Sequence, residues 1–197
     1  MVQMNMDSID TEHSPFAEGT PSFSELNRAV ESLILSASGW RKVFAADGDE
    51  ESTTEEVSAA DKVIAGTAAL CFIEYLCRQG CTRPVVWIGC DSRPTGTALM
   101  NVMMRVLLSL GVQLKASFIT AAPELMAATK VDTDADGFIY ISASHNPIGH
   151  NGFKFGGANG AVLGGKNSAE LIDHFAAALR EERIKEKISK LCSNADP

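Results

Sequence analysis

The chain has 197 residues, of which 17 are Lys or Arg and 25 are Asp or Glu, so its formal net charge is −8. This length corresponds to one large domain with appendages, and a hydrophobic content of 45% is enough to bury a core. The acidic balance argues against nucleic acid or an anionic membrane as the main partner, because both attract a basic face.

The two ends of the chain are expected to lie outside the folded domain. Residues 1–22 are polar, contain Pro15 and Pro21, and have acids where a signal peptide needs a basic region and an apolar run, which predicts a disordered tail. No apolar run approaches the ~20 residues that cross a bilayer. We therefore expect a cytoplasmic protein with one domain over 23–191 and a short tail over 192–197.

Hydrophobic spacing predicts helices that alternate with strands. Residues 23–35 and 57–80 carry apolar positions at helical spacing. Seven acids from Asp47 to Asp61 predict a solvated loop or an acidic first turn of the next helix. The continuous apolar run over 84–90 is typical of a buried central strand. The other predicted elements are strands over 112–118 and 137–142, and helices over 97–110, 123–130 and 166–191. This alternation favours an α/β fold, a three-layer α/β/α sandwich with a mixed, mainly parallel sheet.

The cysteines and histidines do not form a recognisable metal motif. Cys77 and Cys81 are four residues apart, but no second Cys or His pair completes a zinc site with them. A site at His145 and His150 also lacks further ligands. The five cysteines are an odd number, and three lie in or beside apolar runs, so we expect buried structural thiols.

The loops that follow the strands ending at Cys90 and Ser142 are the candidate ligand sites. Ligands of such sheets bind beyond the carboxyl ends of the strands. After Ser142, Pro147 fixes its own backbone and keeps Asn146 out of helical geometry, so the chain is expected to turn sharply. The turn would present Ser144 at the rim of the sheet.

Three side chains near this turn carry useful chemistry. The hydroxyl of Ser144 can act as a nucleophile or a phosphoryl carrier, and His145 beside it can donate a hydrogen bond or stabilise an anion. Lys154 lies between two phenylalanines that would anchor it on a short strand. A lysine held in this way can move a proton or pair with a phosphate.

Two other catalytic motifs are incomplete. Residues 160–167 nearly fit the phosphate-binding loop of nucleotidases, but Asn167 stands where that loop needs a hydroxyl. Ser144 lacks the flanking glycines of a serine-hydrolase elbow. In the loop after Cys90, Arg93 either contacts a substrate or pairs with Asp91 to shape its own loop.

Residues 142–155, SASHNPIGHNGFKF, resemble the active-site serine loop of the α-D-phosphohexomutase family. That family includes phosphoglucomutase, phosphomannomutase and phosphoglucosamine mutase. Three further segments stand in the family's order: 38–42 (SGWRK), 89–93 (GCDSR) and 122–125 (APEL). The resemblance runs from about residue 33 to about residue 180 and covers the first of the family's four domains.

The resemblance implies a role for each matching residue. Ser144 would be phosphorylated and would pass its phosphoryl group to a sugar monophosphate through a hexose 1,6-bisphosphate, which is also the expected activator. Lys154 matches the general acid or base, His145 an active-site histidine, and Arg41 the phosphate-contacting arginine. The other substrate-contacting positions are expected at Ser38, Asn146 and Arg93.

The resemblance places most of the Mg²⁺ site outside this chain. It implies an ion held by a phosphoserine oxygen, here on Ser144, and by three aspartates of a D-G-D-x-D loop in the second domain. Residues 47–49 directly follow the first phosphate-contacting segment, and residues 132–136 precede the catalytic strand, so neither stands in the place of that loop. The second, third and fourth domains are also missing, and we expect the isolated chain to be a fragment without mutase turnover.

The resemblance implies interconversion of hexose 1-phosphate and hexose 6-phosphate in carbohydrate metabolism, with glucose and/or mannose as the sugar. Ser142 is common in phosphoglucosamine mutases, whereas residues 151–154 and 40–42 are closer to phosphoglucomutase and phosphomannomutase. The alternative is a non-catalytic module that binds a sugar phosphate or a protein partner. A lone first domain would expose its face for the second domain, which favours self-association.

Overall fold

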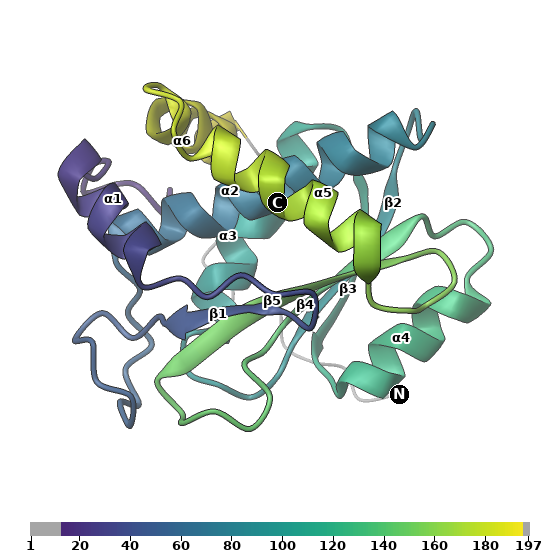
Figure 1. Ribbon diagram of the computed structural model, residues 1–197, viewed down its shortest axis with the longest axis horizontal. Helices are drawn as coiled ribbons and strands as arrows, with labels where there is room; N and C mark the ends of the chain where they lie inside the picture. The colour runs from purple at the N-terminus through teal and green to yellow at the C-terminus, as the bar shows by residue number, and fades with distance from the viewer. Residues whose placement is uncertain (1–12, 195–197) are drawn as a thin grey trace.

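The computed structural model describes residues 13–194, which form a five-stranded sheet between two layers of helices (Figure 1). The strands are β1 (Trp40–Val43), β2 (Val85–Cys90), β3 (Gln113–Ile119), β4 (Gly137–Ile141) and β5 (His150–Gly157). The helices are α1 (Phe23–Glu31), α2 (Ala59–Arg78), α3 (Gly96–Ser109), α4 (Ala122–Val131), α5 (Gly165–Ala178) and α6 (Ile184–Asn194). None of these helices is both long enough and apolar enough to cross a membrane.

The sheet has the order β1-β5-β4-β2-β3 and is mixed, as the sequence predicts. β2 pairs in parallel with β3 and with β4, because α3 and α4 return the chain to the same edge between successive strands. β5 folds back on β4 as an antiparallel hairpin, and β1 is antiparallel to β5. The carboxyl ends of β2 and β4 therefore lie side by side, and the loops that follow them are neighbours.

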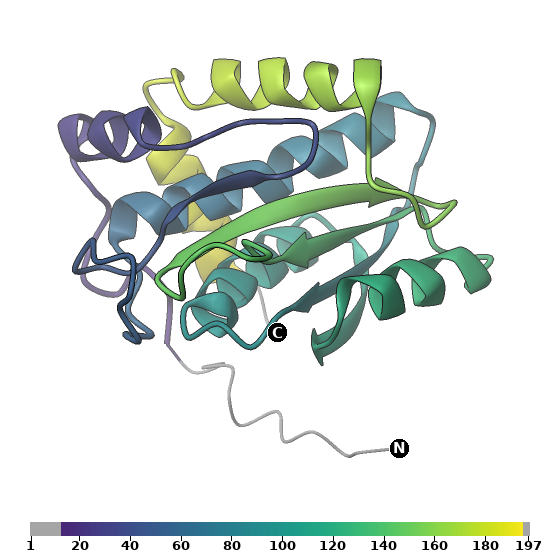
Figure 2. The same cartoon turned by 60° about the horizontal axis from the view of Figure 1, so that its bottom comes forward.

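The two faces of the sheet bury two separate cores. Ile139 and Ile141 of β4 point into the larger core, whereas the alternating residues Phe138 and Tyr140 pack with Leu125 of α4 on the opposite face. Figure 2 shows α4 alone below the sheet and the other five helices gathered above and behind it. The expected three-layer sandwich is confirmed.

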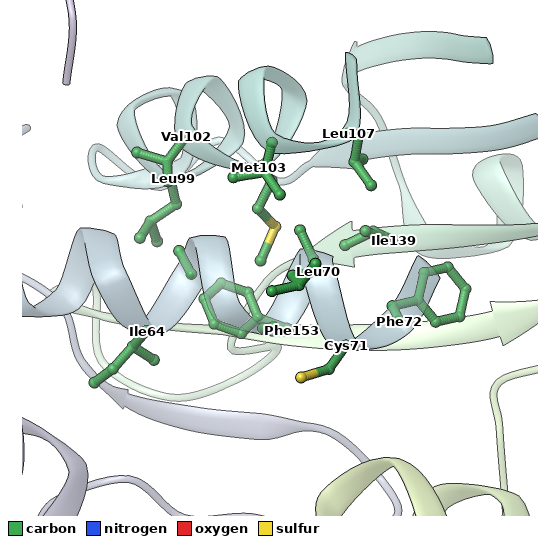
Figure 3. Packing of buried hydrophobic residues seen from close by; sticks show 14 of the residues in the cluster. Ile64, Leu70, Cys71, Phe72, Leu99, Val102, Met103, Leu107, Ile139 and Phe153 are labelled. Atoms are coloured by element: carbon green, nitrogen blue, oxygen red, sulfur yellow. The ribbon is translucent and has the colours of Figure 1, made fainter. Parts of the chain in front are cut away.

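Helix α2 is the centre of the larger core. It is apolar nearly all round, as expected of a helix that is covered on several sides. Figure 3 shows Leu70 of α2 between Met103 of α3 and Phe153 of β5. Ser58 begins the helix, because its hydroxyl accepts a hydrogen bond from the backbone N–H of Asp61 at 3.1 Å.

The prediction of one helix over 166–191 is wrong, because the chain forms α5 and α6 with a turn between them. Phe175 of α5 and Ile184 of α6 are both buried. They are nine residues apart, which in a continuous helix places them roughly 180° apart around the axis. The turn lets α6 bring Ile184, Ile188 and Cys192 back onto the core beside α3.

Strand β1 has no counterpart in the sequence-based prediction. It is four residues long, and its strand character comes from pairing with β5, with Arg41 opposite Gly152. The buried ammonium of Lys42 donates to Asp61 at 2.5 Å and so ties β1 to the start of α2. Burial raises the pKa of Asp61, and the charge of Lys42 opposes that shift.

Residues 13–22 pack against the rest of the domain, whereas the sequence predicts a disordered tail there. Phe16 is buried, and the carbonyl of Pro15 accepts a hydrogen bond from Lys62 at 3.0 Å. Ser22 caps α1 through a reciprocal pair of hydrogen bonds with Glu25. Residues 1–12 and 195–197 of the predicted tails lie outside the described residues, and α6 extends to Asn194.

Replacing Gly152 by alanine will lower the free energy of unfolding by about 3 kcal/mol. A Cβ at this position collides with the carbonyl oxygen of Trp40, so β1 and β5 must move apart. Urea unfolding measures the change. Gly157→Ala on the same strand is the control, because the nearest atom to its Cβ is 3.6 Å away; equal stability of the two variants would contradict the prediction.

Candidate active site

The loop over 142–149 joins β4 to β5 and forms one side of a cavity of about 250 Å³. The other side comes from Ser38, Gly39 and β1. The cavity is lined by Ser38, Gly39, Trp40, Arg41, Ser142, Ala143, Ser144, His145, Asn146 and Lys154. A larger cavity of about 700 Å³ lies between residues 13–19 and the start of α2, and none of the sequence-predicted site residues lines it.

Ser144 and Lys154 lie in direct contact. Lys154 Nζ donates a hydrogen bond to Ser144 Oγ at 2.7 Å. Tyr140 and Lys154 are opposite one another in the β4–β5 hairpin, while Phe153 and Phe155 point into the larger core. Lys154 therefore lies on the opposite face of the sheet. The hairpin brings it into contact with Ser144, which is ten residues earlier in the sequence.

The backbone of Ser144 is strained. Its φ is +56°, a left-handed conformation that costs a non-glycine residue about 1–2 kcal/mol. The hydroxyl of Ser142 accepts the Ser144 N–H at 2.9 Å and helps to hold this geometry. Ser144 and His145 are both exposed, so the serine hydroxyl is presented to solvent beside the Lys154 ammonium.

Arg41 supplies a second positive charge on the same face of the sheet. Arg41 is opposite Gly152, and Gly152 and Lys154 are two residues apart on β5, so the two cations point the same way. The Arg41 guanidinium makes no hydrogen bond or ion pair with residues 13–194. An unpaired guanidinium lining a cavity that also holds an ammonium is suited to bind a phosphate.

Two predicted contact residues also shape the cavity wall. The amide of Asn146 donates to the carbonyl of Ala143 at 2.7 Å, which tightens the turn. Ser38 Oγ lies 3.1 Å from Ser36 Oγ in the turn that precedes Gly39. Gly39 has φ +138°, and a Cβ there would lie 3.2 Å from Cγ of Lys154, so glycine leaves room for the lysine stem.

Arg93 does not line the cavity, although the sequence predicts a substrate contact. Its guanidinium donates to four backbone carbonyls of one loop, those of Ser144 (2.9 Å), Asn146 (2.6 Å), Pro147 and His150 (2.9 Å). Its Nε also pairs with Asp91 at 3.2 Å. The pair with Asp91 is the alternative that the sequence left open, whereas the contacts that hold the serine loop were not predicted.

The sequence analysis missed Asn151, which is buried behind the loop. Its amide donates to Thr95 Oγ1 at 3.0 Å, and its side-chain oxygen accepts the N–H of Gly152 at 2.9 Å. These bonds join β5 to the start of α3 and fix the strand that carries Lys154. The polar Asn-Gly pair near the start of β5 is the signal that could have indicated it.

Comparison with known proteins identifies the fold and its relatives. The family described as phosphoglucomutase/phosphomannomutase, alpha/beta/alpha domain I, matches residues 34–182, which is well over half of the chain. The chain belongs to the phosphoglucomutase/phosphomannomutase family. It is 30% identical over 141 residues to a phosphoglucosamine mutase of Clostridium botulinum (strain Langeland), and 36% identical over 97 residues to that of Bacillus subtilis.

The match to this family covers one part of the relatives. The aligned region is 72% of this chain and 29% of the C. botulinum protein, and 49% and 21% for B. subtilis, so the chain spans less than a third of their length. A crystal structure of a phosphoglucomutase/phosphomannomutase family protein from Burkholderia thailandensis superposes with a TM-score of 0.55 at 22% identity. It covers 74% of this chain and 31% of that one, and at this identity it supports the fold.

Members of the phosphoglucomutase/phosphomannomutase family generally depend on Mg²⁺, and the cavity residues of this chain do not fit such an ion by themselves. Mg²⁺ binds carboxylate and other oxygen ligands, and no Asp or Glu lines the cavity among the described residues.

The two acidic segments considered for Mg²⁺ in the sequence, residues 47–49 and 132–136, have other contacts. Asp132 accepts from Lys115 at 2.5 Å and Trp87 at 2.7 Å, and Asp47 accepts from Ser52 at 2.6 Å; these hydrogen bonds lower the pKa of both aspartates.

Proposed function

We propose that this chain is the phosphoryl-carrying domain of a phosphohexomutase, with Ser144 as the carrier. The enzyme would interconvert hexose 1-phosphate and hexose 6-phosphate through a hexose 1,6-bisphosphate. The observation that carries the proposal is the 2.7 Å contact between Lys154 Nζ and Ser144 Oγ, in a cavity that Arg41 also lines. Membership of the phosphoglucomutase/phosphomannomutase family supports it.

In the proposed reaction, a phosphoryl group leaves Ser144 Oγ for the free hydroxyl of a sugar monophosphate. The bond between phosphorus and Oγ breaks, and a bond between phosphorus and the sugar oxygen forms. The sugar hydroxyl gives up its proton and Oγ takes one up, so one proton moves from the sugar to the serine overall. Lys154 is within reach to give that proton and to take it back when the bisphosphate returns its other phosphoryl group to Ser144. Arg41 would hold a phosphate by charge, which is the main task of a protein in phosphoryl transfer.

The remaining parts of the enzyme are proposed to lie outside this chain. Mg²⁺ would take one oxygen from phosphorylated Ser144 and its other ligands from elsewhere in the full-length gene product. For the isolated chain we therefore expect no mutase turnover. Calorimetry of the isolated chain with glucose 1,6-bisphosphate distinguishes the alternative, a sugar-phosphate-binding module, which gives heat that disappears in Arg41→Ala.

The proposal is tested by phosphorylation of the full-length gene product. Incubation with glucose 1,6-bisphosphate and Mg²⁺ is expected to place one phosphoryl group on Ser144, as located by tandem mass spectrometry. Lys154→Met is expected to slow its formation by about 100-fold or more, because the departing oxygen loses its proton partner. Lys190→Met, which changes an exposed lysine of α6, is the control. Turnover with the phosphoryl group on another residue would contradict the proposal.

The sugar is the second part of this test. Glucose and mannose are the predicted substrates, whereas the similar proteins from C. botulinum and B. subtilis are named phosphoglucosamine mutases. Assays with the 1-phosphates of glucose, mannose and glucosamine, run in parallel on the full-length gene product, decide among them. A kcat/KM for glucosamine 1-phosphate above both others would contradict the predicted preference.

A further inference from the structure

Three side chains that the proposed reaction does not use converge where α2 meets α5. Cys71 and Glu74 are one turn apart on α2, and His174 comes from α5. The Cys71 sulfur, a Glu74 carboxylate oxygen and a His174 ring nitrogen all lie within 4.8 Å of one another. Figure 3 shows the sulfur of Cys71 on the side of α2 that faces away from Met103 of α3. The group lies on a different part of the molecule from the residues that line the Ser144 cavity.

The three donors are of the types that zinc binds in proteins. Zn²⁺ takes thiolate, imidazole and carboxylate ligands at about 2.0–2.3 Å, so the ligand atoms of one tetrahedral ion lie roughly 3.3–3.6 Å apart. His174 Nε2 and Glu74 Oε2 are closer than this, at 2.5 Å, and no two of the three ligand atoms are more than 4.8 Å apart. Side-chain adjustments of about 1 Å would therefore bring all three atoms onto one ion.

The charges of the group also balance a divalent cation. A thiolate, a carboxylate and a neutral imidazole together carry two negative charges. Lys187 lies 3.7 Å from Oε1 of Glu74, which leaves Oε2 for a metal. Glu74 and His174 are partly exposed, so an ion can enter from the solvent side, whereas the Cys71 side chain is buried.

The surroundings of Cys71 disfavour its thiolate form. Burial, with the nearby charge of Glu74, raises the pKa of the Cys71 thiol to about 12. Metal binding must therefore expel the thiol proton, and a metal–sulfur bond replaces the S–H bond as one proton leaves to solvent.

We propose that Cys71, Glu74 and His174 form a site for Zn²⁺, with water as the fourth ligand. An ion at this position joins α2 to α5. His174 precedes Phe175, whose ring lies 4.5 Å from that of Trp40, next to Arg41. The metal would thus steady the helix against which the start of β1 packs.

Cobalt spectroscopy on the full chain under reducing conditions tests the site. One equivalent of Co²⁺ is expected to give a thiolate-to-cobalt charge-transfer band together with the intense visible bands of a four-coordinate ion, and Zn²⁺ should displace both. Cys71→Ala is expected to lose the charge-transfer band. His174→Gln, at a partly exposed position where folding is expected to survive, should weaken binding at least tenfold.

The matched control is Cys77→Ser, which changes the exposed cysteine of the same helix and should leave the spectrum unchanged. Thermal unfolding adds an independent measurement: Zn²⁺ should raise the Tm of the wild-type chain and of Cys77→Ser, but not of His174→Gln. The absence of a charge-transfer band, or a band that persists in Cys71→Ala, would overturn the proposal.

Discussion

Replacing Ser144 by alanine will abolish interconversion of hexose 1-phosphate and hexose 6-phosphate by the full-length gene product, with kcat lowered by at least about 10⁴-fold. The proposed reaction makes and breaks its bond to phosphorus at Ser144 Oγ, and alanine has no atom there. Lys154 Nζ, 2.7 Å away, also loses the atom to which it donates. A coupled assay for hexose 6-phosphate measures the loss, and mass spectrometry should find no phosphoserine in the loop.

Ser142→Ala is the matched control for this variant. Ser142 lies two residues earlier in the same loop, and its hydroxyl accepts the N–H of Ser144 at 2.9 Å. Its loss should loosen the loop and lower kcat by about tenfold, since a single hydrogen bond contributes about 1 kcal/mol. If Ser144→Ala were no worse than Ser142→Ala, Ser144 would not be the phosphoryl carrier.

Replacing Arg93 by alanine will destabilise the fold by about 3 kcal/mol and free the serine loop. The substitution removes a charged donor from four backbone carbonyls and from the carboxylate of Asp91. Urea unfolding measures the stability, and amide hydrogen exchange over residues 144–150 measures the loop. We expect a lower midpoint and faster exchange at these amides. Arg93→Lys should restore little of the lost stability, because one ammonium group cannot donate in all the directions that a guanidinium does.

Arg83→Ala is the control for the loop variant. Arg83 is exposed, and its replacement should change stability by no more than about 0.5 kcal/mol. The same pair of variants decides between the two tasks considered for Arg93. If Arg93 instead contacts a substrate phosphate, Arg93→Ala will raise KM while stability and exchange remain those of the control.

Elements with a complete local signal could be predicted from the sequence. The apolar run of β2 and the long apolar pattern of α2 each lie within one segment, and both were found close to their observed bounds. Strand β1 and the turn between α5 and α6 depend on partners far along the chain. Trp40–Val43 forms a strand because it pairs with β5. The helix ends before Ile184 because a turn is needed there to bring Ile184 into the same core as Phe175.

The residues of the candidate site also differ in whether the sequence could predict them. Ser144, His145 and Lys154 stand in one recognisable segment, so the sequence could single them out, and the β4–β5 hairpin brings Ser144 and Lys154 into contact. The partners of Arg93 could not be predicted, since they are carbonyls more than fifty residues away that no residue type reveals. The group of Cys71 and His174 was missed for the same reason, because the two residues lie on different helices and far apart in the sequence.

The contacts of Arg93 also bear on how this loop can evolve. All four of its loop acceptors are main-chain carbonyls, which every amino acid possesses. Side chains of the loop can therefore be exchanged by mutation without weakening the hold of Arg93, provided that the backbone keeps its path. The residues around Ser144 can then vary while Ser144 itself keeps its position.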